Sequence, residues 1–322
     1  MPGLEIQAFS DDYLGDAAAL LAARHVRHVE VEPLLSARWS EPAAAGDELA
    51  RVWNVDNASG AVALRGGRLV GYLVGAPRDE PIWGENVWVE APGHAVEEAE
   101  VVRDLYGFAA ARWVDEGRPR HYVLVPASEE ELLQAWWRVS FGKQHAHGVR
   151  EVPADTRTAI PAGFEIREPD VAEIEDLIDI DLALPAHQRG SPVFGGRARY
   201  TREESHAEWL ETLERGEEKI LIGAQNGRAV ACWAVVPIER SSEHRGLLAP
   251  DKAGFLGFAA TLPAARGSGI GVALTEAALN WAADEGYASM ATDWRETNLL
   301  ASRFWPRRGF RRTFLRLYRS IP

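Results

Sequence analysis

A glycine-rich segment, residues 263–271, has the residue types of a phosphate-binding loop. Its glycines alternate at Gly267, Gly269 and Gly271. Glycine lets the backbone approach a ligand closely and adopt positive φ angles. Apolar residues at helical spacing begin at Val272, so the loop leads into a helix N-terminus, where free N–H groups and the helix dipole attract anions. Arg266 adds a positive charge suited to phosphate oxygens. The segment predicts an anion site, with a plain glycine-rich turn as the alternative.

A Rossmann dinucleotide site also combines a strand, glycines and a helix, followed by an acidic residue for which Asp293 could be mistaken. The pattern here is not G-x-G-x-x-G, because Val272 stands in place of the third glycine. Four residues beginning with Pro263 also separate the expected strand from Gly267, where a Rossmann turn has almost none. The spacing therefore argues against a nucleotide-dependent oxidoreductase.

Two motifs at the right separation resemble those of the GNAT acetyltransferases. The run Pro263-x-x-Arg266-Gly267-x-Gly269-Ile270-Gly271 is similar to the family's acyl-CoA-binding motif. The run Asn298-x-x-Ala301, with Phe304-Trp305 and Gly309-Phe310 after it, is similar to the family's following helix, usually written N-x-x-A-x-x-x-Y-x-x-x-G-F. The resemblance is strong over residues 254–319, rests on element order over 164–253, and is weak in the N-terminal half.

The resemblance implies coenzyme A, and acetyl-CoA in particular, as the donor substrate. The pyrophosphate would lie on the backbone amides of the glycine-rich loop. The pantetheine arm would pair with the preceding strand, and Asn298 would approach the arm from the other side. The implied donor-binding residues are Ala260, Thr261, Leu262, Arg266, Gly267, Ser268, Gly269, Ile270, Gly271, Val272 and Asn298.

The resemblance is incomplete at the catalytic residues. The family's usual general acid, a tyrosine, is replaced by Trp305, and an indole N–H is not a usable acid near neutral pH. Ser302 and Tyr318 are candidate substitutes, with a helix-surface hydroxyl and a core aromatic as the alternative roles. Asp293, at the end of its expected strand, is the candidate base; its alternative role is to cap the turn into the next helix.

Aromatic residues are the candidates for binding the acceptor. Trp294 and Trp305 could form walls of the acceptor pocket, although large aromatics in such folds are often core. Tyr200 and His187 bound a loop at the place of the family's acceptor-site lid. His145-x-His147 lacks a third ligand in the sequence, so we expect a solvated loop here rather than a metal site.

A weak internal repeat indicates a duplicated domain. Leu4-Glu5-Ile6 recurs as Phe164-Glu165-Ile166, and Asp115-Glu116-Gly117 recurs as Asp284-Glu285-Gly286, in the same order in both halves. We therefore expect a mixed α/β (α+β) fold of two tandem GNAT-like domains, 1–155 and 156–322, each a twisted mixed sheet flanked by helices. In the second domain the expected strands are 164–167, 220–224, 229–236, 254–262, 288–294 and 314–318, with a two-residue hairpin turn at Asn226-Gly227 between the second and the third. The expected helices are 169–184, 206–213, 272–285 and 298–307.

The N-terminal copy lacks the donor motif. When Pro92 is aligned with Pro263, Ala95 replaces Arg266 and the loop contains the carboxylates of Glu97, Glu98 and Glu100. Three carboxylates would repel a pyrophosphate, and Glu129 takes the place of Asn298. We therefore expect domain 1–155 to be non-catalytic.

Composition limits the location and the partners. A net charge of −13 over 322 residues argues against nucleic acid, which requires a basic surface. No apolar run reaches the ~20 residues of a membrane-spanning helix, and the N-terminus does not resemble a signal peptide. The one cysteine, Cys232, cannot form an intramolecular disulfide, so we expect a cytoplasmic protein. Basic residues that are nearly all arginine, with abundant alanine and glycine, indicate a GC-rich bacterial genome.

The expected function is transfer of an acetyl or other acyl group from coenzyme A to an amine of a small molecule, by direct attack of the amine on the thioester. The alternative is a GNAT fold that binds an acyl-CoA or a small effector without turnover. A tryptophan at position 305, where the family has its general acid, favours this alternative. No membrane or nucleic-acid partner is expected, and the chain could be a monomer or a homodimer.

Overall fold

The computed structural model describes residues 3–154, 158–195 and 201–322. They form two compact units. Unit 1 contains residues up to His147 together with Gly246–Ala249 and Arg312–Pro322, and unit 2 contains Gly148–Arg245 and Pro250–Arg311. These units differ from the expected halves 1–155 and 156–322, because the last strand of the chain is hydrogen-bonded within unit 1.

Unit 1 is built from two sheets and four α-helices. Its helices are α1 (Leu14–Val31), α2 (Pro42–Trp53), α3 (Val101–Asp115) and α4 (Glu130–Arg138). Its strands are β1 (Leu4–Ala8), β2 (Ser59–Arg65), β3 (Arg68–Gly75), β4 (Asn86–Val89), β5 (His94–Val96) and β6 (Arg120–Pro126). Strands β1-β2-β3-β5 form an antiparallel sheet. Strand β4 pairs in parallel with β6, which pairs in antiparallel fashion with β13 (Arg311–Ser320).

The apolar faces of α1 and α2 close the core of unit 1. Leu21 of α1 and Leu49 of α2 are fully buried against β2 and β3 residues such as Val62 and Tyr72. Phe314 of β13 belongs to the same core, so the end of the chain completes this unit. Strand β7 (Gly142–Glu151) begins in unit 1 and ends in unit 2.

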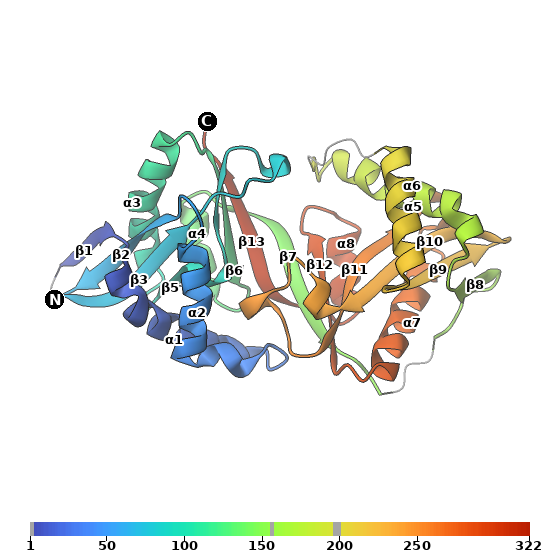
Figure 1. The fold of residues 1–322 in the computed structure, drawn as a ribbon, viewed down its shortest axis with the longest axis horizontal. Coiled ribbons are helices and arrows are strands. Elements are labelled where there is room, and N and C mark those ends of the chain that lie inside the picture. The colour runs from blue at the N-terminus through green and yellow to red at the C-terminus, as the bar shows by residue number, and fades with distance from the viewer. Residues whose placement is uncertain (1–2, 155–157, 196–200) are drawn as a thin grey trace. The chain divides into compact units, whose positions relative to one another are not determined.

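Unit 2 is a twisted mixed sheet with helices on both faces. Its strands are β8 (Phe164–Arg167), β9 (Lys219–Gln225), β10 (Arg228–Pro237), β11 (Ala253–Thr261) and β12 (Ser289–Arg295), hydrogen-bonded in chain order. Its helices are α5 (Ile174–Arg189), α6 (Arg202–Arg215), α7 (Ile270–Asp284) and α8 (Ala301–Arg307). Figure 1 shows α5 and α6 on one side of these strands and α7 on the other. The pairs β8–β9–β10–β11 are antiparallel, and only β11–β12 among them is parallel.

Local sequence chemistry explains most of these elements. Asn226 and Gly227 both have positive φ, as the predicted two-residue hairpin turn requires. Asp170 and Glu173 form a capping box before α5, at the predicted start of that helix. Helix α5 continues past its expected end at residue 184 and ends at Arg189, so the expected loop at residue 187 is the last turn of a helix. No helix in the described ranges is long and apolar enough to cross a membrane.

Candidate functional site

The two parallel strands of unit 2 separate part-way along their length. Strand β11 pairs with β12 only from Ala253 opposite Ser289 to Leu256 opposite Thr292. On its other side β11 stays paired with β10 as far as Thr261, with a bulge at Gly257 where the register shifts. Within the described residues, the edge of 257–261 that points toward β12 therefore has no strand partner. Apart from Thr261 O, which accepts a hydrogen bond from Arg266 Nε, such an edge can present its backbone N–H and C=O groups to an extended ligand.

The glycine-rich loop follows this free edge directly. Gly267 and Gly269 have φ values of 78° and 94°, and Gly269 is the N-cap residue of α7. Ser268 supports the turn, since its Oγ donates to Ala265 O at 2.8 Å and accepts from Ile270 N at 3.3 Å. Among the described residues, no acceptor is hydrogen-bonded to the amides of Gly267, Ser268 or Gly269. The loop therefore presents backbone donors at the positive end of a helix.

The start of α7 is held against the sheet by two glycines. A Cβ on Gly223 of β9 would lie 2.5 Å from Ile270 Cγ1, so the helix packs directly on the strand there. A Cβ on Gly271 would lie 3.3 Å from the ring of Trp233, which lies under the first turn of the helix. Bulkier residues at either position would push the glycine-rich loop away from the free strand edge.

The glycine-rich loop, the strand edge and the three helices α5, α7 and α8 line a cavity of about 410 Å³ in unit 2. The predicted donor residues and aromatic wall that line it are Ala260, Thr261, Arg266, Gly267, Gly269, Ile270, Gly271, Val272, Asn298 and Trp305. Leu262 is not part of the lining, and its amide donates to Val230 O at 2.9 Å. Ser268 likewise contributes through the loop rather than through the cavity wall. The side chain of Arg266 is held beside the strand end by a 3.2 Å hydrogen bond from its Nε to Thr261 O.

Asn298 lies on the opposite wall, between β12 and α8. Its Oδ1 accepts hydrogen bonds from Leu300 N at 3.1 Å and Ala301 N at 3.3 Å, which caps α8. The same Oδ1 lies 3.2 Å from Nε2 of His187, on α5. Because backbone N–H groups hold the oxygen, the NH₂ group of this buried amide is the end left for the cavity.

Trp305 occupies the wall at the position of the family's tyrosine. It is 6% exposed, and its ring packs edge-on against Phe304 at 4.9 Å and Phe310 at 5.4 Å. The aromatic core of α8 therefore fixes this indole in place. Its contribution to the cavity is shape and apolar surface rather than an exchangeable proton.

The other predicted catalytic residues are not part of the cavity lining. Asp293 follows Thr292, the last residue of β12 that pairs with β11, and its Oδ2 lies 4.0 Å from Nδ1 of the buried His244. Burial lowers the pKa of His244, and the charge of Asp293 opposes that shift. Ser302 is on α8, where its amide donates to Asn298 O at 2.9 Å. The catalytic roles of Asp293 and Ser302 stay predictions.

The remaining candidates have separate environments. Trp294 donates from Nε1 to Glu296 Oε1 at 2.8 Å, and its ring lies against the backbone of Gly148. Tyr318 belongs to unit 1, where its ring lies 4.9 Å from that of Tyr122. Tyr200 lies outside the described residues. Neither Trp294 nor Tyr318 is among the residues described as lining the cavity.

His187 is the residue that sequence reasoning placed in the wrong element. It belongs to the last turn of α5, one turn after Ala183 and Leu184, and all three line the cavity. Continuing the apolar period of α5 by one turn would have put position 187 on the face of Ala183 and Leu184. His145 and His147, expected in a solvated loop, lie instead on β7.

Unit 1 has a different structure at the corresponding place. Only residues 97–100 separate β5 from α3, whereas 262–269 separate β11 from α7. The carboxylates of Glu97 and Glu98 form ion pairs with Arg68 and Arg65. These hydrogen-bonded arginines lower the pKa of both carboxyl groups. The expected repulsion of a pyrophosphate by these carboxylates stays a prediction, because arginines partly compensate their charges; the shortened loop is the difference that the structure describes.

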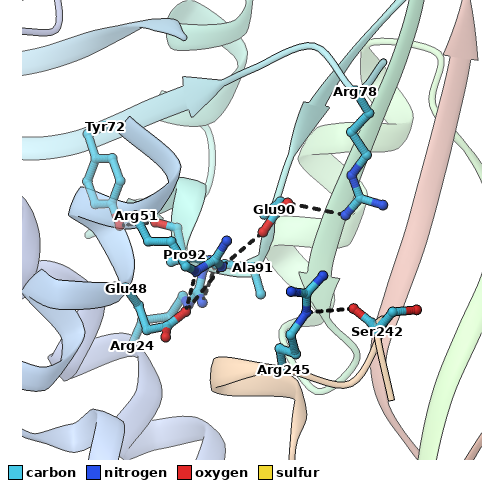
Figure 2. Close-up of polar contacts among 10 residues, drawn as sticks. All are labelled: Arg24, Glu48, Arg51, Tyr72, Arg78, Glu90, Ala91, Pro92, Ser242 and Arg245. Carbon is cyan, nitrogen blue, oxygen red and sulfur yellow. Dashed lines mark hydrogen bonds and ion pairs between the residues drawn. The ribbon is translucent and has the colours of Figure 1, made fainter. Parts of the chain in front are cut away.

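Side chains of unit 1 also occupy its own strand edge. The guanidinium of Arg24, which is 1% exposed, donates to Ala91 O at 2.8 Å and to His94 O. Tyr72 donates its hydroxyl hydrogen to Pro92 O at 2.7 Å, and Figure 2 shows this bond together with the one from Arg24 to Ala91 O. Burial lowers the pKa of His94 to about 3, and its Nε2 bonds Leu124 O of β6 at 2.8 Å. The carbonyls of this edge are thus already bonded within the unit.

Comparison with known families identifies the domain that carries the cavity. Residues 185–310 match the model of the acetyltransferase (GNAT) family. The matched range contains the free strand edge, the glycine-rich loop, Asn298 and Trp305. No curated protein matches the chain.

Solved structures match the chain over its whole length. A GCN5-related N-acetyltransferase from Sphaerobacter thermophilus is 14% identical with a TM-score of 0.58, over 98% of this chain and 95% of that chain. A tandem GNAT protein from the clavulanic acid biosynthesis pathway is 16% identical with a TM-score of 0.50, over 99% and 98%. A glucosamine N-acetyltransferase region of a fungal multi-domain GH3 β-N-acetylglucosaminidase is 14% identical with a TM-score of 0.54, over 99% and 38%. These likenesses confirm the predicted fold of two tandem GNAT-like domains.

Proposed function

We propose that this chain is a GNAT acetyltransferase of the tandem type, which transfers an acetyl group from acetyl-CoA to an amine of a small molecule. One observation carries the proposal. The free edge of β11, the backbone donors of the glycine-rich loop and the amide of Asn298 line a single cavity in unit 2. A thioester carried on a pantetheine arm with a pyrophosphate needs these three kinds of group together.

The chemistry of the cavity matches the parts of that donor. The loop amides and Arg266 suit the pyrophosphate, because both line the cavity, the amides as N–H donors at the positive end of a helix dipole and Arg266 as a cation. The arm contains amide groups, which can pair with the free backbone of 257–261 as an added strand does. Asn298 Nδ2 can donate to a carbonyl of the arm from the other wall.

Direct attack by an amine on the thioester requires mainly positioning. Holding the nucleophile near the carbonyl turns a bimolecular step into an effectively unimolecular one. One group must then take the proton of the amine, and the departing thiolate must gain a proton. The indole of Trp305 can perform neither proton transfer, so its role in this proposal is to shape the cavity wall.

We assign the donor site to unit 2 alone. In unit 1, Arg24, Tyr72 and His94 already bond the carbonyls of the matching strand edge and its neighbour, and the loop before α3 is short. An acyl-CoA entering there would have to break these buried bonds without a glycine-rich loop to replace them. The N-terminal unit is therefore non-catalytic in this account.

A second function has one observation in its favour. The indole of Trp305 occupies the position in the cavity wall where the family has its general acid. The cavity could therefore bind an acyl-CoA or a small effector without turnover. Release of free coenzyme A separates the two functions. We expect thiol release from acetyl-CoA, detected with a thiol reagent, to rise with at least one member of a panel of small amines. Binding of acetyl-CoA with no release across the panel would favour the non-catalytic function.

A further inference from the structure

The cavity of unit 2 has one candidate for handling a proton. Its described lining consists of apolar residues, glycines, Thr261, Asn298, two indoles, Arg266 and His187. Arginine stays charged at all working pH values, and indole, amide and aliphatic hydroxyl groups do not exchange protons as acids or bases near neutral pH. Imidazole is the side-chain type that does. Among the described lining residues, His187 is therefore the group able to act as a base.

The position of His187 is set by the end of helix α5. Its carbonyl accepts the amide of Gly190 at 3.2 Å, which closes the last turn of the helix. Ala183 and Leu184, one turn earlier, line the same cavity. The imidazole is half-buried and projects from a helical turn, so its place does not depend on a long loop.

The hydrogen bond to Asn298 determines the tautomer of His187. Oδ1 of Asn298 accepts backbone N–H groups from Leu300 and Ala301, and only the oxygen end of the amide can do so. The group 3.2 Å from this oxygen, Nε2 of His187, must then be the donor. In the neutral ring the proton is on Nε2, and Nδ1 carries a free lone pair.

Nδ1 is the basic atom. Among residues 3–154, 158–195 and 201–322, no group is hydrogen-bonded to it. The charged group facing the same cavity from another element is Arg266, and Arg295 of β12 is bonded through Nε to Gln188 at 3.2 Å on the adjoining position of α5. No described carboxylate lines the cavity, so the imidazole is the group there that can accept a proton from an ammonium formed in the reaction.

From this geometry we propose that His187 is the general base of the reaction; the proposal rests on the acetyl transfer proposed above. The neutral amine forms the new C–N bond at the thioester carbonyl, and the C–S bond breaks. The proton of the attacking nitrogen moves to Nδ1 of His187, and the imidazolium is stabilised by its Nε2–H bond to Asn298. The imidazolium then returns that proton to the thiolate, directly or through water. The products are the acetylated amine and free coenzyme A.

This relay removes the need for a tyrosine at position 305. One imidazole both accepts the proton of the nucleophile and supplies the proton of the leaving group. The indole of Trp305 can then be an apolar wall without loss of chemistry.

The first test determines the tautomer of the His187 imidazole directly. Long-range ¹H–¹⁵N correlation spectra of the full chain, with the His187 signals assigned by their loss in His187→Gln, report the tautomer. We expect the Nε2–H form at neutral pH and a shift of the His187 signals on adding acetyl-CoA. An Nδ1–H tautomer, or signals that acetyl-CoA leaves unchanged, would overturn the proposal.

The second test is kinetic and uses the amine of the panel that gives the fastest release. His187→Gln keeps an N–H donor for Asn298 but has no basic atom, so the cap and the fold are retained. We expect kcat to fall at least 100-fold, the acidic limb of the kcat/KM pH profile to disappear, and the Kd for acetyl-CoA to change less than threefold. The matched control is His206→Gln, the same change at an exposed position of α6.

The outcomes separate the two proposals. A His187→Gln variant with wild-type kcat and an unchanged acidic limb would refute His187 as the base while leaving acetyl transfer intact. A wild-type chain that binds no acetyl-CoA would refute the proposed function, and the role of His187 with it. Loss of acetyl-CoA binding in His187→Gln alone would make His187 a donor-binding residue and not the base.

Discussion

Thr292 Oγ1 donates a hydrogen bond of 2.9 Å to the carbonyl of Leu256, and these two residues are the last that pair β11 with β12. The bond therefore lies where the two strands separate. Beyond it, β11 remains attached to β10 through a bulge at Gly257, while the other edge of β11 faces the cavity. The donor site of this account follows from that divergence, because a fully paired β11 would have no backbone groups to offer.

Asn298 has two separable roles, as a helix cap and as a cavity amide. Asp keeps an oxygen that can accept from Leu300 N and Ala301 N, whereas Ala does not. We expect Asn298→Ala to lower the free energy of unfolding by about 1 kcal/mol, and Asn298→Asp to leave it nearly unchanged. Both should weaken acetyl-CoA binding at least tenfold, because both lose the NH₂ donor. Urea unfolding and calorimetric titration measure the two effects, and an Asn298→Asp variant with full affinity would contradict the assigned role of the amide.

Gly223 sets the distance between α7 and the sheet. A Cβ at this position would approach Ile270 Cγ1 to 2.5 Å. Gly223→Ala should lower the free energy of unfolding by about 1–3 kcal/mol through overpacking, and should weaken acetyl-CoA binding by moving the start of α7. Because the clash is with one side chain, Ile270→Ala should remove part of the cost.

The Gly223 and Ile270 substitutions form a double-mutant cycle. The double variant should lose less stability than the two single variants added together, and urea unfolding of all four proteins measures the difference. If the losses of unfolding free energy were strictly additive, the side chains at 223 and 270 would not be in the steric contact that the geometry implies.

Gly269 combines a strained backbone with a place in the donor loop. With φ at 94°, an L side chain there costs roughly 1–2 kcal/mol. Gly286 provides the control, because its φ is 76° and a Cβ there would meet nothing within 4 Å. We expect Gly269→Ala and Gly286→Ala to lower stability similarly, and only Gly269→Ala to weaken acetyl-CoA binding. Equal loss of binding in both variants would mean that general destabilisation, and not the loop, is responsible.

The buried histidines of unit 1 make stability depend on pH. Burial and the charge of Arg24 lower the pKa of His28 to about 3, and burial lowers that of His121 to about 4. Below an unfolded pKa of ~6.5 the unfolded chain binds protons that the folded chain does not. Stability is therefore present above that value and is lost as the pH falls toward the folded pKa, by about 1.4 kcal/mol per pH unit for each such histidine.

His28→Gln tests this dependence at one site. Glutamine can donate a hydrogen bond in the same place but cannot take up a proton. We expect the fall in unfolding free energy between pH 6 and pH 4 to be about 1.4 kcal/mol per pH unit shallower in the variant, measured by urea unfolding at a series of pH values. Parallel curves for the variant and the wild type would show that His28 is not buried neutral in the folded chain.

The donor loop could be predicted from sequence because its determinants are local. Alternating glycines, Arg266 and the following helical period specify a turn and a helix start within a few residues. The hairpin turn at Asn226 and Gly227 is local in the same sense, and its positive φ values confirm it. Asn298, recognised through its motif, lines the same cavity.

The catalytic candidates depended on long-range structure, which local patterns do not encode. Tyr318 was assigned to the C-terminal copy, but its strand pairs with β6 and belongs to unit 1. The sequence pattern predicts a loop at His187 because it ends the helix at residue 184, whereas α5 continues to Arg189. The point where β11 leaves β12 depends on a pairing between residues 36 apart in sequence, Leu256 and Thr292. No pattern in the sequence reports where such a pairing stops.

Isothermal titration of acetyl-CoA into the full chain tests the central claim most directly, with Val272→Glu and Val272→Gln as a matched pair. Val272 lines the cavity in the first turn of α7, where a carboxylate suits the helix dipole but competes with a pyrophosphate for the loop amides. The account predicts one site per chain in the wild type, retained in Val272→Gln and weakened at least tenfold in Val272→Glu. Two sites per chain, no site, or equal binding by both variants would contradict a single donor site at the start of α7.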